Sequence, residues 1–126
     1  MPIETRDLVE VAAKAASDKL ATDPVLMDVA GRLAIAESFL ILSAPTERQV
    51  RAIAEEILDR VAAELGLEPA RIEGRTGNRW ILIDYVDLVV HVLIDEERDY
   101  YRLESLWADG TITRLEDASS RDLVRA

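Results

Sequence analysis

The 126-residue sequence has no cysteine, one histidine and few aromatic residues. Without cysteine, disulfides, thiolate metal sites and cysteine nucleophiles are all excluded. The longest apolar run, Leu88 to Ile94, is interrupted by His91 and falls far short of the ~20 residues of a membrane span. The first residues are polar and include acids, so we expect no signal or transit peptide and a cytoplasmic location.

Positive charge is also scarce, with 15 basic residues against 25 acidic ones and a net charge of −10. A nucleic-acid backbone would repel such a surface, so little direct nucleic-acid contact is expected. A basic protein partner is better matched by charge complementarity. The plainer alternative is that the charge only keeps the domain in solution.

Motifs for common enzyme chemistry are missing from the sequence. It contains no Gly-x-Gly-x-x-Gly, no P-loop and no Gly-x-Ser-x-Gly. Asp84 and Asp87 are the most suggestive acids, because paired carboxylates can hold magnesium for phosphoryl or nucleotidyl transfer. They stand three residues apart, which in one extended strand would point them to opposite faces, and turn capping is the plainer interpretation. For His91, a hydrogen-bonded position on or near the core is favoured over a metal or catalytic role.

The periodicity predicts an α/β fold with helices packed on one mixed five-stranded sheet. Its clearest element is a helix after Pro45, where Thr46 to Gln49 fits a capping box and an apolar stripe at steps of three and four reaches Leu65 before Gly66. Two further helices are predicted over 5–21 and 95–107. The predicted strands are 25–29, 38–43, 70–73, 79–84 and 88–94, the last two joined as a hairpin. One domain over 1–107 and a flexible tail over 108–126 follow.

Aromatic and acidic residues are concentrated between Trp80 and Asp109. This segment holds both tryptophans, all three tyrosines, eight acids and two arginines. Aromatic residues surrounded by charges are typical of protein interfaces. The alternative, equally weighted on residues alone, is that the aromatic residues are partly core and the acids simply solvated.

The same segment resembles the ribosomal silencing factor family, also called the iojap-related family. The resemblance rests on a tryptophan strand from Arg79, an Asp-x-x-Asp turn from Asp84, a Val-Val-His strand and a Leu-Glu-x-Leu-Trp ending at Trp107. It covers roughly residues 5–107. There are two departures from the family pattern. Val86 stands where the family usually has glycine, so that an altered hairpin is expected. The loop before the second helix is Ser43-Ala44-Pro45-Thr46, where the family usually has Thr-Gly-Thr-Ser.

The resemblance implies a nucleotidyltransferase-like topology without the catalytic equipment, and therefore no enzyme, cofactor or metal. It also implies a homodimer and binding to the large ribosomal subunit through ribosomal protein fourteen. The bound factor would sterically block association of the two subunits and repress translation under nutrient limitation. The expected partner-binding residues are Trp80, Asp84, Tyr85, Asp87, His91, Arg98, Tyr101, Glu104 and Trp107. The rival hypotheses are a magnesium-dependent nucleotidyltransferase-like enzyme using Asp84 and Asp87, and an adaptor for another basic protein.

Overall fold

The capped apolar stripe after Pro45 forms helix α2 (Glu47–Leu65) in the computed structural model, which describes residues 5–28, 38–101 and 111–114. Thr46 is the N-cap, and its Oγ1 accepts a hydrogen bond from the Gln49 backbone N–H at 3.1 Å. Gly66 ends the helix in the left-handed conformation (φ 63°) and donates its N–H to the Ala62 carbonyl. The reciprocal half of the predicted capping box is wrong, because the Gln49 amide instead donates to the carbonyls of Lys19 and Leu20.

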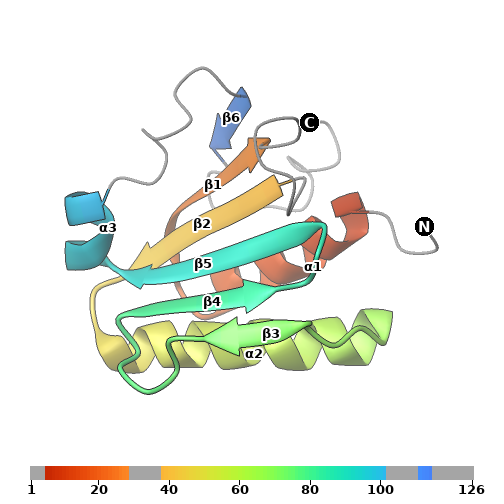
Figure 1. The fold of residues 1–126 in the computed structure, drawn as a ribbon, viewed down its shortest axis with the longest axis horizontal. Coiled ribbons are helices and arrows are strands. Elements are labelled where there is room, and N and C mark those ends of the chain that lie inside the picture. Colours follow the sequence, from red (N-terminus) through yellow and green to blue (C-terminus); the bar gives the residue numbers. More distant parts are fainter. Residues whose placement is uncertain (1–4, 29–37, 102–110, 115–126) are drawn as a thin grey trace.

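One mixed sheet runs through the molecule, in the order β3-β4-β5-β2-β1-β6 (Figure 1). Its central pair, β2 and β5, is parallel, and the other neighbours are antiparallel. The predicted fold class is confirmed, with one strand more than the five expected. The strands are β1 (Thr22–Asp28), β2 (Ser38–Ala44), β3 (Arg71–Glu73), β4 (Trp80–Asp84), β5 (Leu88–Ile94) and β6 (Thr111–Arg114).

Strand β6 corrects the prediction of a flexible tail from residue 108 onward. It pairs antiparallel with β1, with Thr111 opposite Asp28 and Arg114 opposite Val25. Four residues are too few to show an apolar period, so only the neighbouring strand reveals this element. Residues 108–110 and 115–126 lie outside the described residues.

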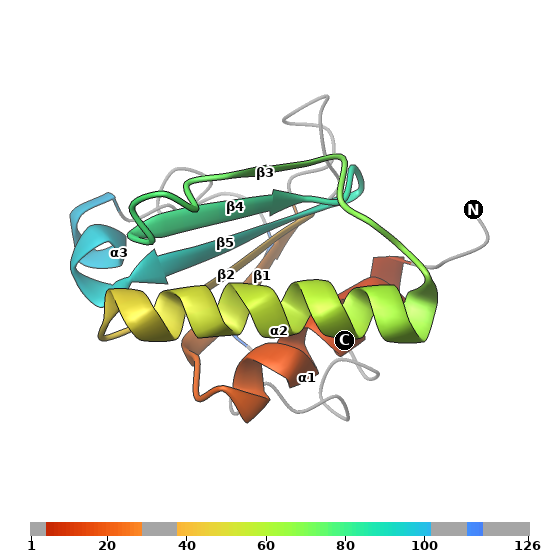
Figure 2. The same cartoon turned by 90° about the horizontal axis from the view of Figure 1, so that it is seen from below.

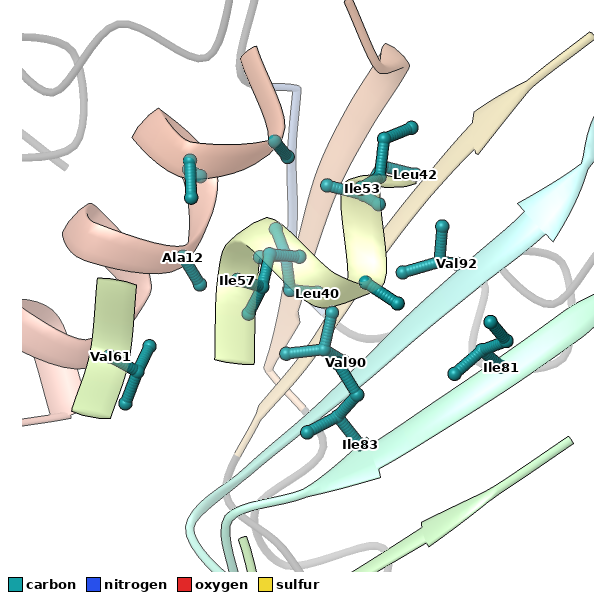
Figure 3. Close-up of a cluster of buried hydrophobic side chains, with 14 of the residues drawn as sticks. Ala12, Leu40, Leu42, Ile53, Ile57, Val61, Ile81, Ile83, Val90 and Val92 are labelled. Atoms are coloured by element: carbon teal, nitrogen blue, oxygen red, sulfur yellow. The ribbon is translucent and has the colours of Figure 1, made fainter. Parts of the chain in front are cut away.

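Helices α1 (Thr5–Asp18) and α2 lie on the same face of the sheet (Figure 2). Alternate residues of the central strands meet them, as Ile83 on β4 and Val90 on β5 do (Figure 3). Ile53, Ile57 and other apolar residues of α2 are fully buried against this side of the sheet. We call this the helix face of the sheet.

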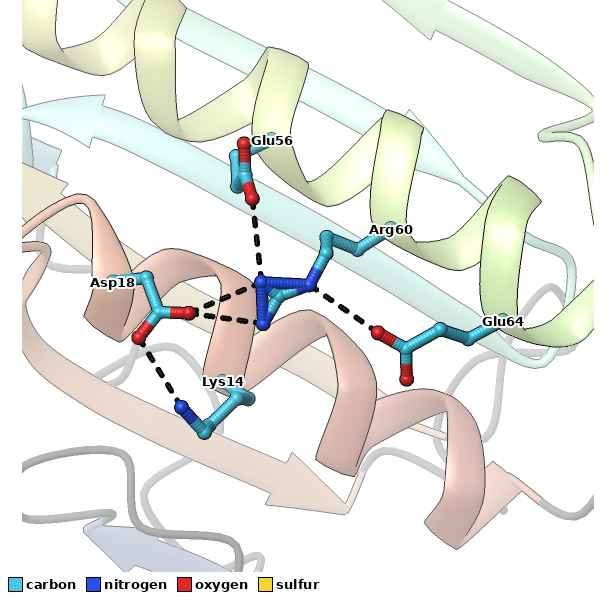
Figure 4. Close-up of polar contacts among 5 residues, drawn as sticks. All are labelled: Lys14, Asp18, Glu56, Arg60 and Glu64. Atoms are coloured by element: carbon cyan, nitrogen blue, oxygen red, sulfur yellow. Dashed lines mark hydrogen bonds and ion pairs between the residues drawn. The ribbon is translucent and has the colours of Figure 1, made fainter.

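The two helices are also joined by charged side chains (Figure 4). Arg60 of α2 pairs with Asp18 of α1 at 2.9 Å, and with Glu56 and Glu64 on its own helix at 3.3 Å. Lys14 pairs with Asp18 from the other side at 3.2 Å. Arg60 therefore fixes how the end of α1 lies against α2.

Two predicted boundaries moved by three residues. Helix α1 ends at Asp18 rather than Ala21, and Leu20 turns the chain with a positive φ of 65°. Strand β1 begins at Thr22, three residues early, and accommodates Pro24 through an irregular register. Helix α3 (Asp95–Tyr101) starts where predicted, and 102–107 lie outside the described residues. Across the described ranges, no helix has the length and apolar character to cross a membrane.

Candidate functional site on the open face of the sheet

Along each strand, every second side chain points into the core under α1 and α2, and the others lie on the opposite face of the sheet. We call it the open face because neither α1 nor α2 covers it, although most of its apolar side chains are at most 6% exposed. Because successive strand residues point to opposite faces, Trp80 and Leu82 on β4 share this face with His91 on β5. A second, smaller apolar cluster forms here, separate from the core under the helices. It consists of Val25, Met27, Phe39, Ile41, Val89 and Leu93, with Trp80 and Leu82 packed against it.

The turn before β4 places Trp80. Gly74 adopts φ 88°, and a side chain there would collide with the Trp80 carbonyl oxygen, so glycine is required. Arg79 then anchors the start of the strand, through Glu47 of α2 and Glu96 and Glu97 of α3. Two acids of the aromatic and acidic segment are thus engaged within the domain.

Trp80 and His91 form a hydrogen-bonded pair. The Trp80 indole Nε1–H donates to His91 Nδ1 at 3.1 Å. An indole nitrogen only donates, so Nδ1 must be the unprotonated nitrogen and the neutral imidazole carries its hydrogen on Nε2. The ring is 5% exposed, lies 4.7 Å from the Phe39 ring centroid, and burial lowers the pKa of His91 to about 4. His91 is therefore neutral at pH 7, in agreement with the predicted hydrogen-bonded position.

A hollow of about 320 Å³ opens beside this pair. Its lining is mostly apolar, with one acid and one base at the rim. The lining residues are Phe39, Arg71, Leu82, Asp84, Val86, Val89 and His91. Residues from β2, β3, β4, β5 and the hairpin turn meet here, which makes the hollow a property of the assembled sheet.

Asp84 organises the hairpin turn at the edge of the hollow. Its Oδ1 accepts from the Val86 backbone N–H at 2.8 Å, and its Oδ2 pairs with Arg71 at 3.4 Å. This is the turn-capping role that the plainer interpretation assigned to Asp84. Asp87 follows in the same turn and is half-buried. Among the described residues, no group of three or more His, Asp or Glu side chains is arranged to hold a metal ion.

Of the nine predicted binding residues, the structure brings together Trp80, Asp84 and His91, and Asp87 lies in the adjoining hairpin turn. Two others, Tyr85 and Arg98, do not line the hollow, and their side chains are held inside the domain. Tyr85 is 5% exposed in the core under the helices, where burial and the nearby Glu68 raise its pKa. Arg98 is 7% exposed and donates to the Thr22 carbonyl and Ser43 Oγ, so it holds α3 against the sheet.

The side chains of the remaining three are outside the described part of the chain. Tyr101 ends α3, its side chain being outside the described part, and Glu104 and Trp107 lie outside the described residues. Sequence reasoning also missed two residues of the hollow, Phe39 and Val86. Phe39 could have been found from the alternation of β2, whereas Val86 was noted only as a departure from a family pattern.

Comparison with known proteins identifies the family. The sequence profile described as "Ribosomal silencing factor during starvation" matches residues 2–125. The chain belongs to the ribosomal silencing factor family. The match extends past residue 107, where the resemblance was expected to end, and so includes β6.

Individual silencing factors agree with this result over nearly their whole length. The ribosomal silencing factor of Halalkalibacterium halodurans is 43% identical over 118 residues, which cover 94% of this chain and 100% of that protein. The one from Bacillus subtilis is 40% identical over 111 residues, covering 88% and 93%. The crystal structure of a protein from Chromobacterium violaceum matches with a TM-score of 0.80 at 28% identity, over 84% of this chain and 88% of that one. Both sequence relatives are named ribosomal silencing factors.

Proposed function

We propose that this chain binds ribosomal protein fourteen on the large ribosomal subunit, and that the bound domain keeps the small subunit from joining. The observation that carries the proposal is the open face, where the Trp80–His91 pair lies beside the hollow with Asp84 at its rim, next to the turn that contains Asp87. Helices α1 and α2 both cover the other face. The open face therefore offers an aromatic anchor to a basic protein, and the turn beside it offers the carboxylate of Asp87, whereas Asp84 is already paired with Arg71.

Charge supports a protein contact in preference to an RNA contact. With a net charge of −10, the chain is repelled by exposed ribosomal RNA and attracted to a basic protein patch. Blocking the association of the two subunits requires no catalysis. A domain of this length is roughly 30 Å across, and its bulk alone keeps apart the two subunit surfaces that must meet. Repression of translation in the cytoplasm when nutrients are short is part of the same proposal.

No specific observation favours the enzyme alternative. Both carboxylate oxygens of Asp84 are already engaged, by the Val86 N–H and by Arg71. A homodimer, which the family resemblance implied, stays a prediction that sedimentation velocity tests directly.

The first test is co-sedimentation with isolated ribosomal subunits. The protein should pellet with large subunits and not with small ones, and rising salt should weaken the binding because the attraction is electrostatic. Light scattering on mixing the subunits should show that joining fails in its presence. Equal binding to both subunits would remove the basis of the proposal.

The second test locates the interface on the open face. Trp80→Ala should weaken binding at least ~thirtyfold, as expected for a buried aromatic anchor worth about 2 kcal/mol or more. Trp80→Phe, which keeps a ring and loses the N–H donor, should lose less. Circular dichroism must show that both variants remain folded, because Trp80 also packs against the smaller apolar cluster.

A matched pair of charge reversals separates local from overall electrostatics. Asp87→Lys and Asp59→Lys change the net charge equally, but Asp59 is exposed on α2, away from the open face. Only Asp87→Lys should weaken binding strongly, since it places a like charge against the basic partner. Equal losses for the two variants would show that only overall charge matters, and would put the interface elsewhere.

A further inference from the structure

The hairpin turn contains a side chain in an unfavourable conformation. Val86 has a positive φ of 78°, and its side chain is 58% exposed. A β-branched residue is a rare occupant of this region, and such strain persists mainly where function requires it. Glycine would adopt the same turn without the penalty. Since Val86 buries little within the domain yet borders the hollow, its isopropyl group is placed to contact something outside the chain.

The floor of the hollow holds a second feature that the fold leaves unsatisfied. His91 Nε2 is buried and has no hydrogen-bond partner among the described residues. The two nitrogens of an imidazole point in nearly opposite directions, and Nδ1 faces Trp80, which does not line the hollow. Since His91 lines the hollow and Nδ1 is occupied by Trp80, Nε2 is the ring nitrogen left for a group bound there. A buried donor without a partner lowers stability, so a ligand that supplies an acceptor there gains affinity.

We propose that the hollow is a recognition pocket for a main-chain carbonyl and its adjoining apolar side chain from the protein partner, with His91 Nε2–H as the donor and Val86 as the apolar lip. This inference rests on the proposed function, which supplies a basic protein as the occupant. Its chemistry follows from the lining. A neutral imidazole N–H can only donate, so Lys and Arg side chains are excluded from the floor, and Phe39, Leu82 and Val89 receive apolar atoms. The basic side chains of the partner belong instead beside Asp87 in the turn, because Asp84 at the rim is already paired with Arg71.

Substitutions at Val86 should move stability and binding in opposite directions. Val86→Gly relieves the strain, so Tm should rise by about 3–5 °C for a chain of this length. It also removes the apolar lip, so calorimetry with purified ribosomal protein fourteen should show roughly fivefold weaker binding. Val86→Ala is the matched control. It keeps a Cβ at positive φ and loses the two methyl groups, so binding should weaken similarly without the gain in Tm.

Two substitutions of His91 test whether binding depends on the Nε2–H donor or on the shape of the imidazole ring. Asparagine can place an acceptor near the Nδ1 position and has nothing at Nε2, whereas glutamine can place an N–H donor near Nε2. His91→Asn should therefore bind roughly five- to tenfold more weakly than His91→Gln, a difference typical of one hydrogen bond. In the wild type, the His91 Nε2–H proton should shift downfield in the nuclear magnetic resonance spectrum when the partner binds.

The outcomes distinguish this inference from the proposed function. If the wild type does not bind ribosomal protein fourteen, both are overturned. If the wild type binds, but Val86→Gly binds equally well and the His91 Nε2–H resonance is unmoved, only the pocket is refuted and the open face still stands. If Val86→Gly binds weakly and also lowers Tm, the valine is structural and the lip is refuted.

Discussion

Acidification should destabilise this domain through His91 well before most carboxylates are protonated. Burial lowers the pKa of His91 from 6.5 to about 4 in the folded chain, while the unfolded chain keeps the ordinary value. Between these two values the unfolded chain binds a proton that the folded chain does not. Unfolding is therefore favoured as pH falls, and stability is lost from about pH 6.5 down to about pH 4. A pKa difference of this size changes the free energy of unfolding by about 3 kcal/mol, which is a large part of a small domain's stability.

The assay is urea unfolding at a series of pH values from neutral to about pH 4.5, followed by the fluorescence of the tryptophans. His91→Gln does not titrate and is the matched control, because the carboxylates contribute equally to both proteins. The free energy of unfolding of the wild type should fall faster than that of the variant over this range. Parallel curves would refute the reasoning, because they would mean that His91 titrates alike in the folded and unfolded states.

Three further predictions concern the scaffold. Thr46→Ala removes the N-cap of α2 and should reduce the free energy of unfolding by about 1 kcal/mol in urea titrations, with Thr76→Ala, in an exposed turn, as the neutral control. Arg60→Ala breaks the link between α1 and α2 and should cost up to about 1 kcal/mol, less at high salt, whereas Arg51→Ala, which removes the pair with Glu55 inside α2, should cost less. Truncation after Gly110 deletes β6 and leaves the edge of β1 unpaired, so Tm should fall relative to truncation after Arg114; unchanged Tm in both would show that β6 adds nothing.

Local chemistry alone was enough to predict several elements of this protein. The stripe of α2, the Thr46 cap and Gly66 act within a few residues of one another, and the structure confirms them. Strand β5 and the hairpin before it were also predicted correctly, because an apolar run and a short polar turn are local signals. The fold class followed from the order of these elements, and the family from motifs that are continuous in the sequence.

The features that the sequence did not predict depend on pairing between strands that are far apart in the sequence. Tyr85 and Asp84 are neighbours in the chain, but the pleat sends Tyr85 into the core and leaves Asp84 at the rim of the hollow. Strand β6 is recognisable only because β1 has an unpaired edge for it. The hollow needs Phe39 of β2 beside His91 of β5, a contact set by parallel pairing between segments about fifty residues apart.

The conformation of Val86 is the clearest example of the difference between what local sequence predicts and what strand pairing determines. Its sequence context predicts a turn, but only the assembled sheet shows that the turn holds valine at positive φ beside a buried imidazole N–H. Short-range signals depend on residues that are close in sequence, so they can be read from the chain. A site made by five different segments depends on how the strands align, and that alignment is determined by burying the whole core at once.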